Sequence, residues 1–539
     1  MSEQAGSDRA EADSAETETT ETATTETDST ETAAAETATT ETDTSGEPVG
    51  GIVAAPSTTS DLLTYAPALE SAAIVDIAPT YDLWIDGRWV APSSGERFPT
   101  MNPATGETLS QVALASPQDV DAAVAAARAA SEDWAARSGA DRAKYMYRLA
   151  RLVQDRAREL AVLESLDGGK PIRESRDIDV PLVAAHLFHH AGWADKLDYA
   201  FPGRRWHPLG VVGQVIPWNF PLLMAAWKLG PALACGNTVV LKPAESTPLT
   251  ALLLAQLVDE AGFPPGVVNV LTGAGETGAA LVSHPDLDKV AFTGSTEVGR
   301  QIMRTLAPRA TPMTLELGGK AANVVFEDAA LDQAVEGVVN GIWFNQGHVC
   351  CAGSRLLVQE SIVEPFVAKL QRRMATLRVG DPLDKNTDVG AINSEEQLGR
   401  IRELVQSGLD EGAELYEAPC PLPDRGWFLR PMMFTDVTPA MRIAREEIFG
   451  PVLSVLTFRT EDEAVAKAND TAYGLSAGVW TEKGSRILWM AERLRSGVVW
   501  ANTFNQFDPT APFGGFGDSG FGREGGIQGL RHYVRMEAA

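Results

Sequence analysis

The spacing of apolar residues after residue 80 predicts a series of strands and helices. Residues 83–90 read as two short strands around an Asp-Gly turn, because bulky apolar residues flank a dipeptide that favours tight turns. Residues 117–137 are rich in alanine, open with a serine and a proline, and carry apolar residues at helical spacing. The same spacing runs through residues 140–165. We therefore expect a strand pair followed by two amphipathic helices.

From Gly210 onward, short apolar runs alternate with helical stretches. Runs rich in β-branched residues predict strands at residues 211–216, 238–241, 267–271 and 289–292. Helical spacing lies between them, at residues 222–233, 248–261 and 275–283. Alternating strands and helices favour a parallel sheet with helices on both faces, and a second such set begins near Ala321.

Residues 1–60 have a different composition. They repeat Thr-Glu and Ala-Thr-Thr and contain almost no large apolar side chain before Ile52. Such a segment cannot bury enough surface to offset the entropy lost on ordering it, so we expect it to be disordered. An inert extension, a solubility tail and a partner-binding arm all fit this composition.

The charge of the chain limits its partners. The 539 residues carry a net charge of −28, of which −13 lies within residues 1–50 and −15 in the remainder. Nucleic-acid binding needs clustered Lys and Arg, so this balance argues against a nucleic-acid partner. An ordinary acidic protein and an adaptation to high salt both fit an acidic body. The length is enough for two or three domains.

The cysteines and the N-terminus indicate the compartment. Two of the four cysteines are adjacent, which does not fit a disulfide framework, and their spacing matches no zinc motif; they are Cys235, Cys350, Cys351 and Cys420. No run of about 18 apolar residues occurs, as a membrane helix would need. The polar N-terminus has neither the basic nor the apolar region of a secretory signal. We expect a cytoplasmic protein with no membrane partner and no metal.

The adjacent cysteines are the first candidates for chemistry. A buried cysteine is more often part of the core than a nucleophile. Here, however, Gly347 and Gly353 flank Cys350 and Cys351, as expected where the backbone bends to present a side chain. A thiolate attacks carbonyl carbon once the pKa of the thiol is lowered. The residues alone leave both interpretations open.

A thiol nucleophile needs an oxyanion stabiliser and a base, and two segments offer them. Asn219 lies between Pro217 and Pro221 at the end of an apolar strand, where its amide fits either an oxyanion donor or a structural turn. Glu316 lies in an apolar stretch before two glycines. Its carboxylate fits either a structural ion pair or a base whose pKa burial raises toward neutrality.

Taken together, seven ordered segments resemble the signatures of the aldehyde dehydrogenase superfamily. They are Ile216–Pro221, Lys242–Glu245, Phe292–Thr296, Leu315–Lys320, Gly347–Arg355, Glu446–Val452 and Pro512–Gly515. The resemblance covers residues 80–536. The number, order and spacing of the segments make chance agreement negligible.

The resemblance implies an NAD-dependent oxidation of a small-molecule aldehyde to a carboxylic acid. Cys350 occupies a position similar to that of the family's nucleophile, and Glu316 one similar to that of the base that activates water. Asn219 and the backbone N–H of Cys350 resemble the groups that form the oxyanion hole. Two other classes of protein fit these residues less well. Relatives that pass the thioester to CoA generally lack a glutamate at the position of Glu316, and a non-enzymatic scaffold on this fold would not need the three residues together.

The resemblance also implies a binding site for NAD. Lys242 and Glu245 resemble the residues that hold the adenosine ribose, where a carboxylate repels the 2′-phosphate of NADP. Ser295 lies where a turn feeds a helix N-terminus, which suits the pyrophosphate. Glu447 and Phe449 resemble contacts on the nicotinamide side. The full implied set is Ile216, Pro217, Trp218, Lys242, Ala244, Glu245, Gly275, Gly278, Phe292, Gly294, Ser295, Val298, Leu317, Glu447 and Phe449.

One glycine pattern has two readings. Residues 273–278 fit G-x-G-x-x-G between a predicted strand and a predicted helix, a pattern that in a common dinucleotide fold holds the pyrophosphate. The resemblance instead places these glycines near the adenine, and we follow the resemblance.

Three positions depart from the family pattern. His348 stands where relatives usually have Gln or Glu, and we interpret it as a tolerated neighbour of the thiol or as a residue that tunes it. Val389 stands where relatives often place a polar ribose contact, which predicts that this contact is missing. Gly517 replaces a frequent lysine. Four further residues match the substrate tunnel of relatives and favour apolar aldehydes, namely Phe220, Trp227, Phe507 and Phe513.

The resemblance implies the domain organisation. A Rossmann-like cofactor domain is expected from residues 80–189 and 209–318, an α/β catalytic domain from residues 319–518, and a small β oligomerisation element. That element would combine a hairpin at residues 190–208 with a shortened C-terminal segment at residues 519–539. Because longer relatives use a further strand there to pair subunits, we expect a homodimer, with a tetramer as the alternative.

Overall fold

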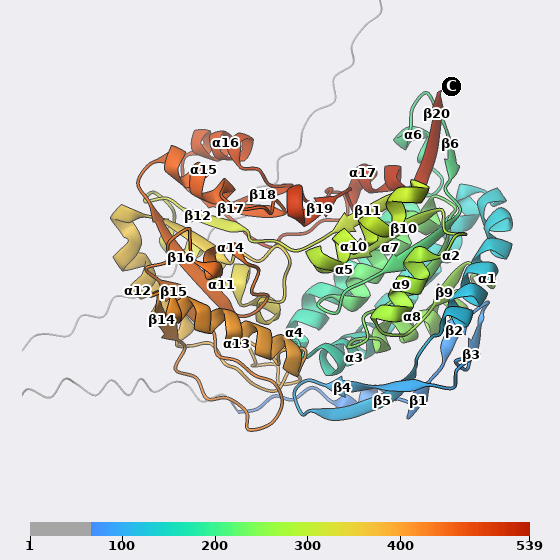
Figure 1. Ribbon diagram of the computed structural model, residues 1–539, viewed down its shortest axis with the longest axis horizontal. Helices are drawn as coiled ribbons and strands as arrows, with labels where there is room; N and C mark the ends of the chain where they lie inside the picture. The colour runs from blue at the N-terminus through green and yellow to red at the C-terminus, as the bar shows by residue number, and fades with distance from the viewer. Residues whose placement is uncertain (1–65, 539) are drawn as a thin grey trace, which may run out of the picture. The chain divides into compact units, whose positions relative to one another are not determined.

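The computed structural model of the protein describes residues 66–538, so the expected disorder of residues 1–60 lies outside the described residues. Two large sheets with helices on their faces dominate this part of the chain (Figure 1). The expected α/β class is confirmed. No helix within residues 66–538 is long and apolar enough to cross a membrane.

The first large sheet has eight strands, in the order β19-β11-β10-β7-β8-β9-β2-β3. Its five central strands run parallel, and short antiparallel strands lie at both edges. Nearly every residue of β7, β8, β9 and β10 is buried, as expected when helices cover both faces. The strands are β2 (Leu83–Ile85), β3 (Arg88–Val90), β7 (Val211–Val215), β8 (Thr238–Lys242), β9 (Val268–Val270), β10 (Lys289–Thr293), β11 (Met313–Glu316) and β19 (Gly520–Phe521).

The helices predicted in this half are present, with one difference. The helix predicted at residues 140–165 is two helices, because Arg156 leaves helical geometry and pairs with Glu159 and Glu260 instead. Apolar periodicity continues across a break of one residue, so spacing alone does not show it. The helices are α1 (Pro117–Ala136), α2 (Gly139–Asp155), α3 (Ala157–Gly168), α4 (Ile172–Glu174), α5 (Val180–Trp193), α7 (Pro221–Ala234), α8 (Leu249–Glu260), α9 (Gly275–Ser283) and α10 (Thr296–Leu306).

The second large sheet has seven strands, in the order β14-β15-β16-β13-β12-β17-β18, and all but β14 run parallel. Its strands are β12 (Ala322–Val325), β13 (Arg355–Gln359), β14 (Glu414–Glu417), β15 (Met432–Thr435), β16 (Val452–Phe458), β17 (Ser476–Trp480) and β18 (Val498–Ala501). Its helices are α11 (Leu331–Ile342), α12 (Val363–Met374), α13 (Glu395–Asp410), α14 (Arg442–Arg445), α15 (Glu461–Asn469) and α16 (Gly484–Arg493). The second α/β set expected near Ala321 is therefore present.

Smaller elements complete the described chain. A three-stranded sheet, in the order β1-β5-β4, is formed by β1 (Thr80–Tyr81), β4 (Arg97–Asn102) and β5 (Glu107–Ala113). Short helical turns are η1 (Ala72–Ile74), η2 (Ser175–Asp179), η3 (Ala307–Arg309), η4 (Phe344–Gly347), η5 (Glu360–Ile362), η6 (Gly517–Ser519), η7 (Arg531–Tyr533) and α17 (Gly526–Leu530).

The prediction of a hairpin at residues 190–208 is wrong. This segment holds the end of α5, the short helix α6 (Leu197–Ala200) and the single strand β6 (Arg204–Pro208). The strand that pairs with β6 is β20 (Val534–Ala538), at the other end of the chain, and the two run antiparallel (Figure 1). The segment at residues 519–539 thus contains a strand, and the ribbon that it completes joins distant parts of the sequence.

Candidate active site

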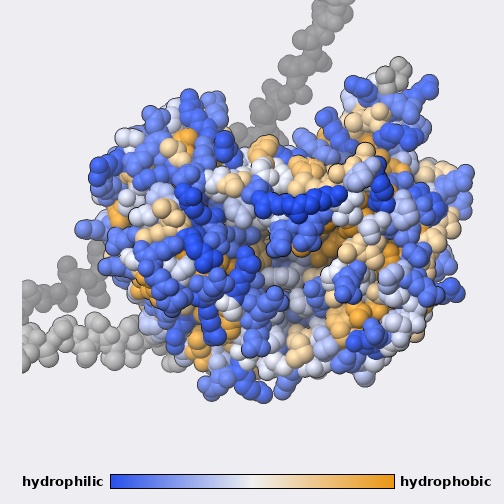
Figure 2. All heavy atoms as spheres, in the orientation of Figure 1, coloured by the Kyte–Doolittle hydropathy of each residue, from blue (hydrophilic) through white to orange (hydrophobic). Residues whose placement is uncertain are grey.

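One cavity lies between the two large sheets. It has a volume of about 1230 Å³. Its walls come from the segments that follow β7, β10 and β11 of the eight-stranded sheet and from those that precede β13, β16 and β17 of the seven-stranded sheet. Ligands of α/β folds commonly bind outside the carboxyl ends of parallel strands. Figure 2 shows that the face in view is mostly hydrophilic and has apolar residues in the hollow near its centre.

A strained turn presents Cys350 to the cavity. The three residues Asn345, Gln346 and Gly347 all have positive φ angles, of 46°, 53° and 75°. A side chain at Gly347 would overlap the backbone of Gly450, so only glycine fits there. Strained backbone of this kind persists where the surrounding structure fixes it, and it clusters at functional sites.

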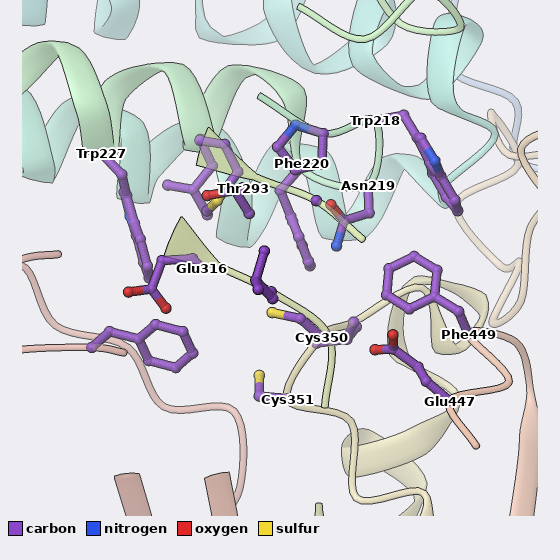
Figure 3. Close-up of a pocket in the computed structure, with 18 of the residues that line it drawn as sticks. Trp218, Asn219, Phe220, Trp227, Thr293, Glu316, Cys350, Cys351, Glu447 and Phe449 are labelled. Atoms are coloured by element: carbon purple, nitrogen blue, oxygen red, sulfur yellow. The ribbon is translucent and has the colours of Figure 1, made fainter. Parts of the chain in front are cut away.

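Cys350 and Cys351 differ in their surroundings although both line the cavity. Cys350 is half-buried, whereas Cys351 is buried and its thiol lies 3.7 Å from the Oδ1 atom of Asn505, to which it donates. A hydrogen bond with Cys351, burial and the charge of Glu447 raise the pKa of the Cys350 thiol well above its ordinary value. Figure 3 shows the Cys350 sulfur pointing toward the side of the cavity where Glu316 lies.

Asn219 follows β7 and points its amide toward Cys350 (Figure 3). Its Nδ2 atom donates a hydrogen bond of 2.9 Å to the carbonyl oxygen of His348, and its backbone carbonyl oxygen accepts one of 2.8 Å from the Nδ2 atom of Asn345. These bonds fix the amide against the loop that carries the thiol. The second hydrogen of Nδ2 is available for an oxygen atom bound beside Cys350.

Glu316 ends β11 and is almost completely buried, with 4% of its surface exposed. Neither carboxylate oxygen has a hydrogen-bond partner within the described chain. Burial and the charge of Glu524 raise the pKa of Glu316 well above its usual range, and the charge of Lys228 opposes that rise. A Cβ at Gly514 would come within 2.7 Å of the Glu316 carboxylate, so this glycine leaves room for the acid.

Predicted cofactor residues form the other end of the cavity. Ser295 accepts a hydrogen bond from the backbone N–H of Val298 and so caps α10. Glu447 accepts a hydrogen bond of 2.9 Å from the N–H of Gly319, and burial raises the pKa of this acid to about 7. The members of the predicted set that line the cavity are Pro217, Trp218, Gly294, Ser295, Leu317, Glu447 and Phe449.

The remaining predicted cofactor residues lie beyond the cavity. Lys242 and Glu245 form an ion pair of 3.5 Å, and a Cβ at Gly278 would contact the Lys242 side chain at 3.5 Å. The structure thus brings together the two residues expected at the adenosine ribose and one of the glycines expected near the adenine. The predicted residues outside the cavity are Ile216, Lys242, Ala244, Glu245, Gly275, Gly278, Phe292 and Val298.

The expectation that Val389 provides no polar contact to the ribose stays a prediction. Val389 is completely buried and does not line the cavity, whereas Gln397 does. The amide of Gln397 donates a hydrogen bond of 2.9 Å to the carbonyl of Phe449, and its backbone N–H is capped by Ser394. Gln397 therefore brings a polar side chain to the side of the cavity where Phe449 lies. Sequence analysis missed Gln397, and the signal that could have found it is Ser394, the serine cap at the start of α13.

The absence of lysine at position 517 has a structural reason. Gly517 has a φ of 60°, and a Cβ there would lie 2.5 Å from the carbonyl oxygen of Ala472. Any larger residue would be strained at this position.

Four aromatic residues predicted for the substrate tunnel line the same cavity. Trp227, Phe507 and Phe513 contact one another, with ring centroids 5.4 to 6.1 Å apart. Phe220 stacks on Phe344, which sequence analysis missed, at 6.2 Å. Aromatic rings thus wall the end of the cavity away from Glu447.

Comparisons with known proteins agree with this fold and site. The family model described as "Aldehyde dehydrogenase family" matches residues 89–539. Retinal dehydrogenase 2 from Rattus norvegicus is 47% identical over 84% of this chain and 90% of its own length. A Bacillus cereus aldehyde dehydrogenase solved as an NAD⁺ complex is 43% identical, with a TM-score of 0.82 over 85% of this chain and 96% of that one.

A third relative is a P. syringae indole-3-acetaldehyde dehydrogenase solved in complex with NAD⁺ and IAA. It is 43% identical and has a TM-score of 0.83, over 86% of this chain and 96% of that one. Fold and site define an α/β enzyme with a thiol, an amide and a carboxylate around one cavity between its two large sheets. The chain belongs to the aldehyde dehydrogenase family.

Proposed function

We propose that this protein is an NAD-dependent aldehyde dehydrogenase that oxidises an aldehyde to a carboxylic acid through a thioester on Cys350. The observation that carries the proposal is the convergence of Cys350, Asn219 and Glu316 on one cavity from three separate segments. The family and the NAD⁺ complexes of two relatives support it.

The residues present fit NAD. Glu447 is held through one oxygen by Gly319, which leaves the other oxygen to accept a ribose hydroxyl. The N-terminus of α10 at Ser295 offers backbone N–H groups to a pyrophosphate. Lys242 and Glu245 would hold the ribose of the adenosine. Bound there, NAD would supply the hydride acceptor.

The chain's own groups account for the first half of the reaction. Because the pKa of Cys350 is raised, its thiol must first lose its proton to solvent. The thiolate sulfur then adds to the aldehyde carbon, and the carbonyl oxygen becomes an oxyanion. Asn219 and the backbone N–H of Cys350 stabilise that oxyanion by donating hydrogen bonds. Re-formation of the carbon–oxygen double bond would leave a thioester on Cys350, and NAD, where bound, would supply the acceptor for the hydride that the carbon gives up.

Glu316 accounts for the second half. A water molecule loses a proton to the Glu316 carboxylate as its oxygen attacks the thioester carbon. The carbon–sulfur bond breaks, the carboxylic acid leaves, and Cys350 regains its thiolate. A base for this step benefits from a raised pKa, which burial and Glu524 supply.

We further propose an uncharged apolar or aromatic aldehyde as the substrate. Trp227, Phe507 and Phe513 offer a wall of rings, and Phe220 faces the same cavity. Lys170 approaches the Phe220 ring at 4.2 Å, but this lysine is buried and paired with Asp179. It is therefore unavailable to a second carboxylate on the substrate. The name of the P. syringae relative, an indole-3-acetaldehyde dehydrogenase, is consistent with an aromatic substrate.

Three variants test the proposed mechanism. Cys350→Ser should abolish NADH formation, while Cys351→Ser should keep most of it, because the thiol of Cys351 is engaged by Asn505. Glu316→Gln should keep a pre-steady-state burst of NADH and lose steady-state turnover, because only thioester hydrolysis needs the base. A dead Cys351→Ser variant, or a Glu316→Gln variant without a burst, would contradict the assigned roles.

Assembly and location remain predictions. We propose a homodimer, which light scattering coupled to gel filtration would test; a mass of four chains would contradict it. We also propose a cytoplasmic location, because all four cysteines are free thiols in the described chain. Fractionation of cells that produce the protein would test this location.

A further inference from the structure

His348 belongs to a closed cluster of three rings. It lies two residues before Cys350 and is almost completely buried. Its imidazole packs edge-on against Trp218 at 4.8 Å and stacks on Phe449 at 5.8 Å, with an angle of 18° between the planes. Trp218 and Phe449 also contact each other, at 5.2 Å. We refer to these three residues as the His348 cluster.

The His348 cluster joins three segments that border the cofactor end of the cavity. Trp218 follows β7 of the eight-stranded sheet, and Phe449 precedes β16 of the seven-stranded sheet. Both line the cavity, and Figure 3 shows them on the side away from Trp227. His348 does not line it and packs behind them, in the loop that carries the thiol. The histidine is therefore placed to hold two walls of the cavity in position.

The backbone of His348 is tied to the proposed oxyanion donor. Its carbonyl oxygen accepts hydrogen bonds of 2.9 Å from Asn219 and 3.3 Å from Asn345. Any shift of His348 would therefore move the amide of Asn219 as well as the two rings.

The His348 ring contributes shape rather than charge. Burial and the nearby charge of Lys170 lower the pKa of His348 to about 3, so the imidazole is neutral at ordinary pH. Its Nε2 atom is buried without a hydrogen-bond partner among residues 66–538. A neutral ring cannot stabilise the Cys350 thiolate by charge, and an unpaired buried nitrogen gains nothing from being polar. The remaining contribution of the imidazole is its flat surface, which stacks on Phe449.

We propose that His348 is a positioning residue whose ring holds Trp218 and Phe449 in the arrangement that binds the cofactor. This inference rests on the proposed NAD-dependent function. It replaces both earlier interpretations of the position, the tolerated neighbour and the group that tunes the thiol by charge. Offset and edge-on aromatic pairs of this kind each contribute about 0.5–1.5 kcal/mol beyond burial, or about two- to tenfold in an equilibrium constant.

The test compares a side chain without a ring with one that keeps it. We expect His348→Gln to raise the Kd for NAD about three- to tenfold, measured by calorimetry without aldehyde, and to change the KM for the aldehyde by less than about twofold. His348→Phe keeps a ring and should restore the Kd to within about twofold of the original. It also removes the unpaired nitrogen, so its thermal midpoint should be equal or higher.

His189→Gln is the matched control. His189 is a half-buried histidine on α5 that contacts Trp193 and does not line the cavity. Its replacement should leave the Kd for NAD unchanged. If His348→Gln fails to fold, His348→Leu supplies the ring-free side chain.

Two outcomes would overturn the inference. One is an unchanged Kd for NAD in the ring-free variant, and the other is a Kd in His348→Phe as weak as in His348→Gln. Failure of the proposed function is distinguishable from both, because the unaltered protein would then bind no NAD and form no NADH from any aldehyde.

Discussion

Lys228 and Glu524 form an ion pair that is almost completely buried, although 296 positions separate them in the sequence. Lys228 lies on α7, and Glu524 lies between β19 and α17. Both charges act on Glu316 in opposite directions, because Glu524 raises the pKa of that acid and Lys228 lowers it. Burial raises the pKa of Glu316 most, and the balance between these two charges adjusts it further.

Changing either partner should move the pH profile of thioester hydrolysis. The base works as a carboxylate, so hydrolysis is lost as the pH falls through the pKa of Glu316. Glu524→Gln removes a negative neighbour, lowers that pKa and should shift the acid limb to lower pH by about 1–3 units. Lys228→Met should shift it to higher pH. The measurement is the rate after the NADH burst as a function of pH.

The stability of these variants needs its own control. Removing one partner of a buried pair costs about 3–5 kcal/mol, because the other charge remains unpaired. The double replacement Lys228→Met with Glu524→Leu removes both charges and should recover much of the thermal midpoint. Shifts of the two single variants in the same direction would show that these charges do not control Glu316.

Gly319 lies directly against the backbone of Cys350, and a side chain there would overlap the Cys350 carbonyl oxygen. Gly319→Ala should therefore displace the thiol and reduce kcat by about 100-fold. We expect a loss of stability of about 1–3 kcal/mol from overpacking. Gly399→Ala is the matched control, because a Cβ at this position in α13 meets nothing within 4 Å. That variant should keep full activity and gain up to about 1 kcal/mol.

Elements with local signals could be predicted from the sequence. The helix at residues 275–283 has the predicted bounds, and β7, β8, β9 and β10 lie within two residues of the predicted runs. The pairing of β6 with β20 could not be predicted, because strands from opposite ends of a chain leave no local pattern. A hairpin at residues 190–208 was therefore the wrong expectation.

The candidate site divides in the same way. The family resemblance places Cys350, Asn219 and Glu316 at one site, and the structure brings them to one cavity. The resemblance does not show what surrounds Glu316, because the Lys228–Glu524 pair forms only when distant segments pack. It also gives less information about loops.

Position 389 lies in such a loop. The polar group beside Phe449 is Gln397, while Val389 belongs to the core. The spacing between motifs carries less information in loops than in strands, and only the packing of α13 shows which side chain reaches the cavity.

Deleting residues 2–60 should leave activity and stability nearly unchanged. The segment carries fourteen of the acids and almost no large apolar side chain, so it has little surface to bury. We expect the thermal midpoint to change by less than about 2 °C. Differential scanning calorimetry of the full and shortened chains makes the comparison. A larger drop would show that this segment packs against the rest of the protein.

The cofactor preference should depend on Glu245. This residue is exposed and forms a 3.5 Å ion pair with Lys242, where the resemblance places the adenosine ribose. A carboxylate accepts hydrogen bonds from ribose hydroxyls and repels a 2′-phosphate, so the protein should use NAD better than NADP. Glu245→Gln keeps the side-chain shape, removes the negative charge and leaves Lys242 free to attract the phosphate. We expect the ratio of kcat/KM for NAD to that for NADP to fall by roughly tenfold, or about 1.4 kcal/mol.

Asp259→Asn, which removes an exposed acid near the end of α8, controls for the overall change in charge and should leave the ratio unchanged. Comparable kcat/KM values for both cofactors in the unaltered protein would contradict the assignment of Glu245, and equal effects of the two replacements would show that net charge rather than position is responsible.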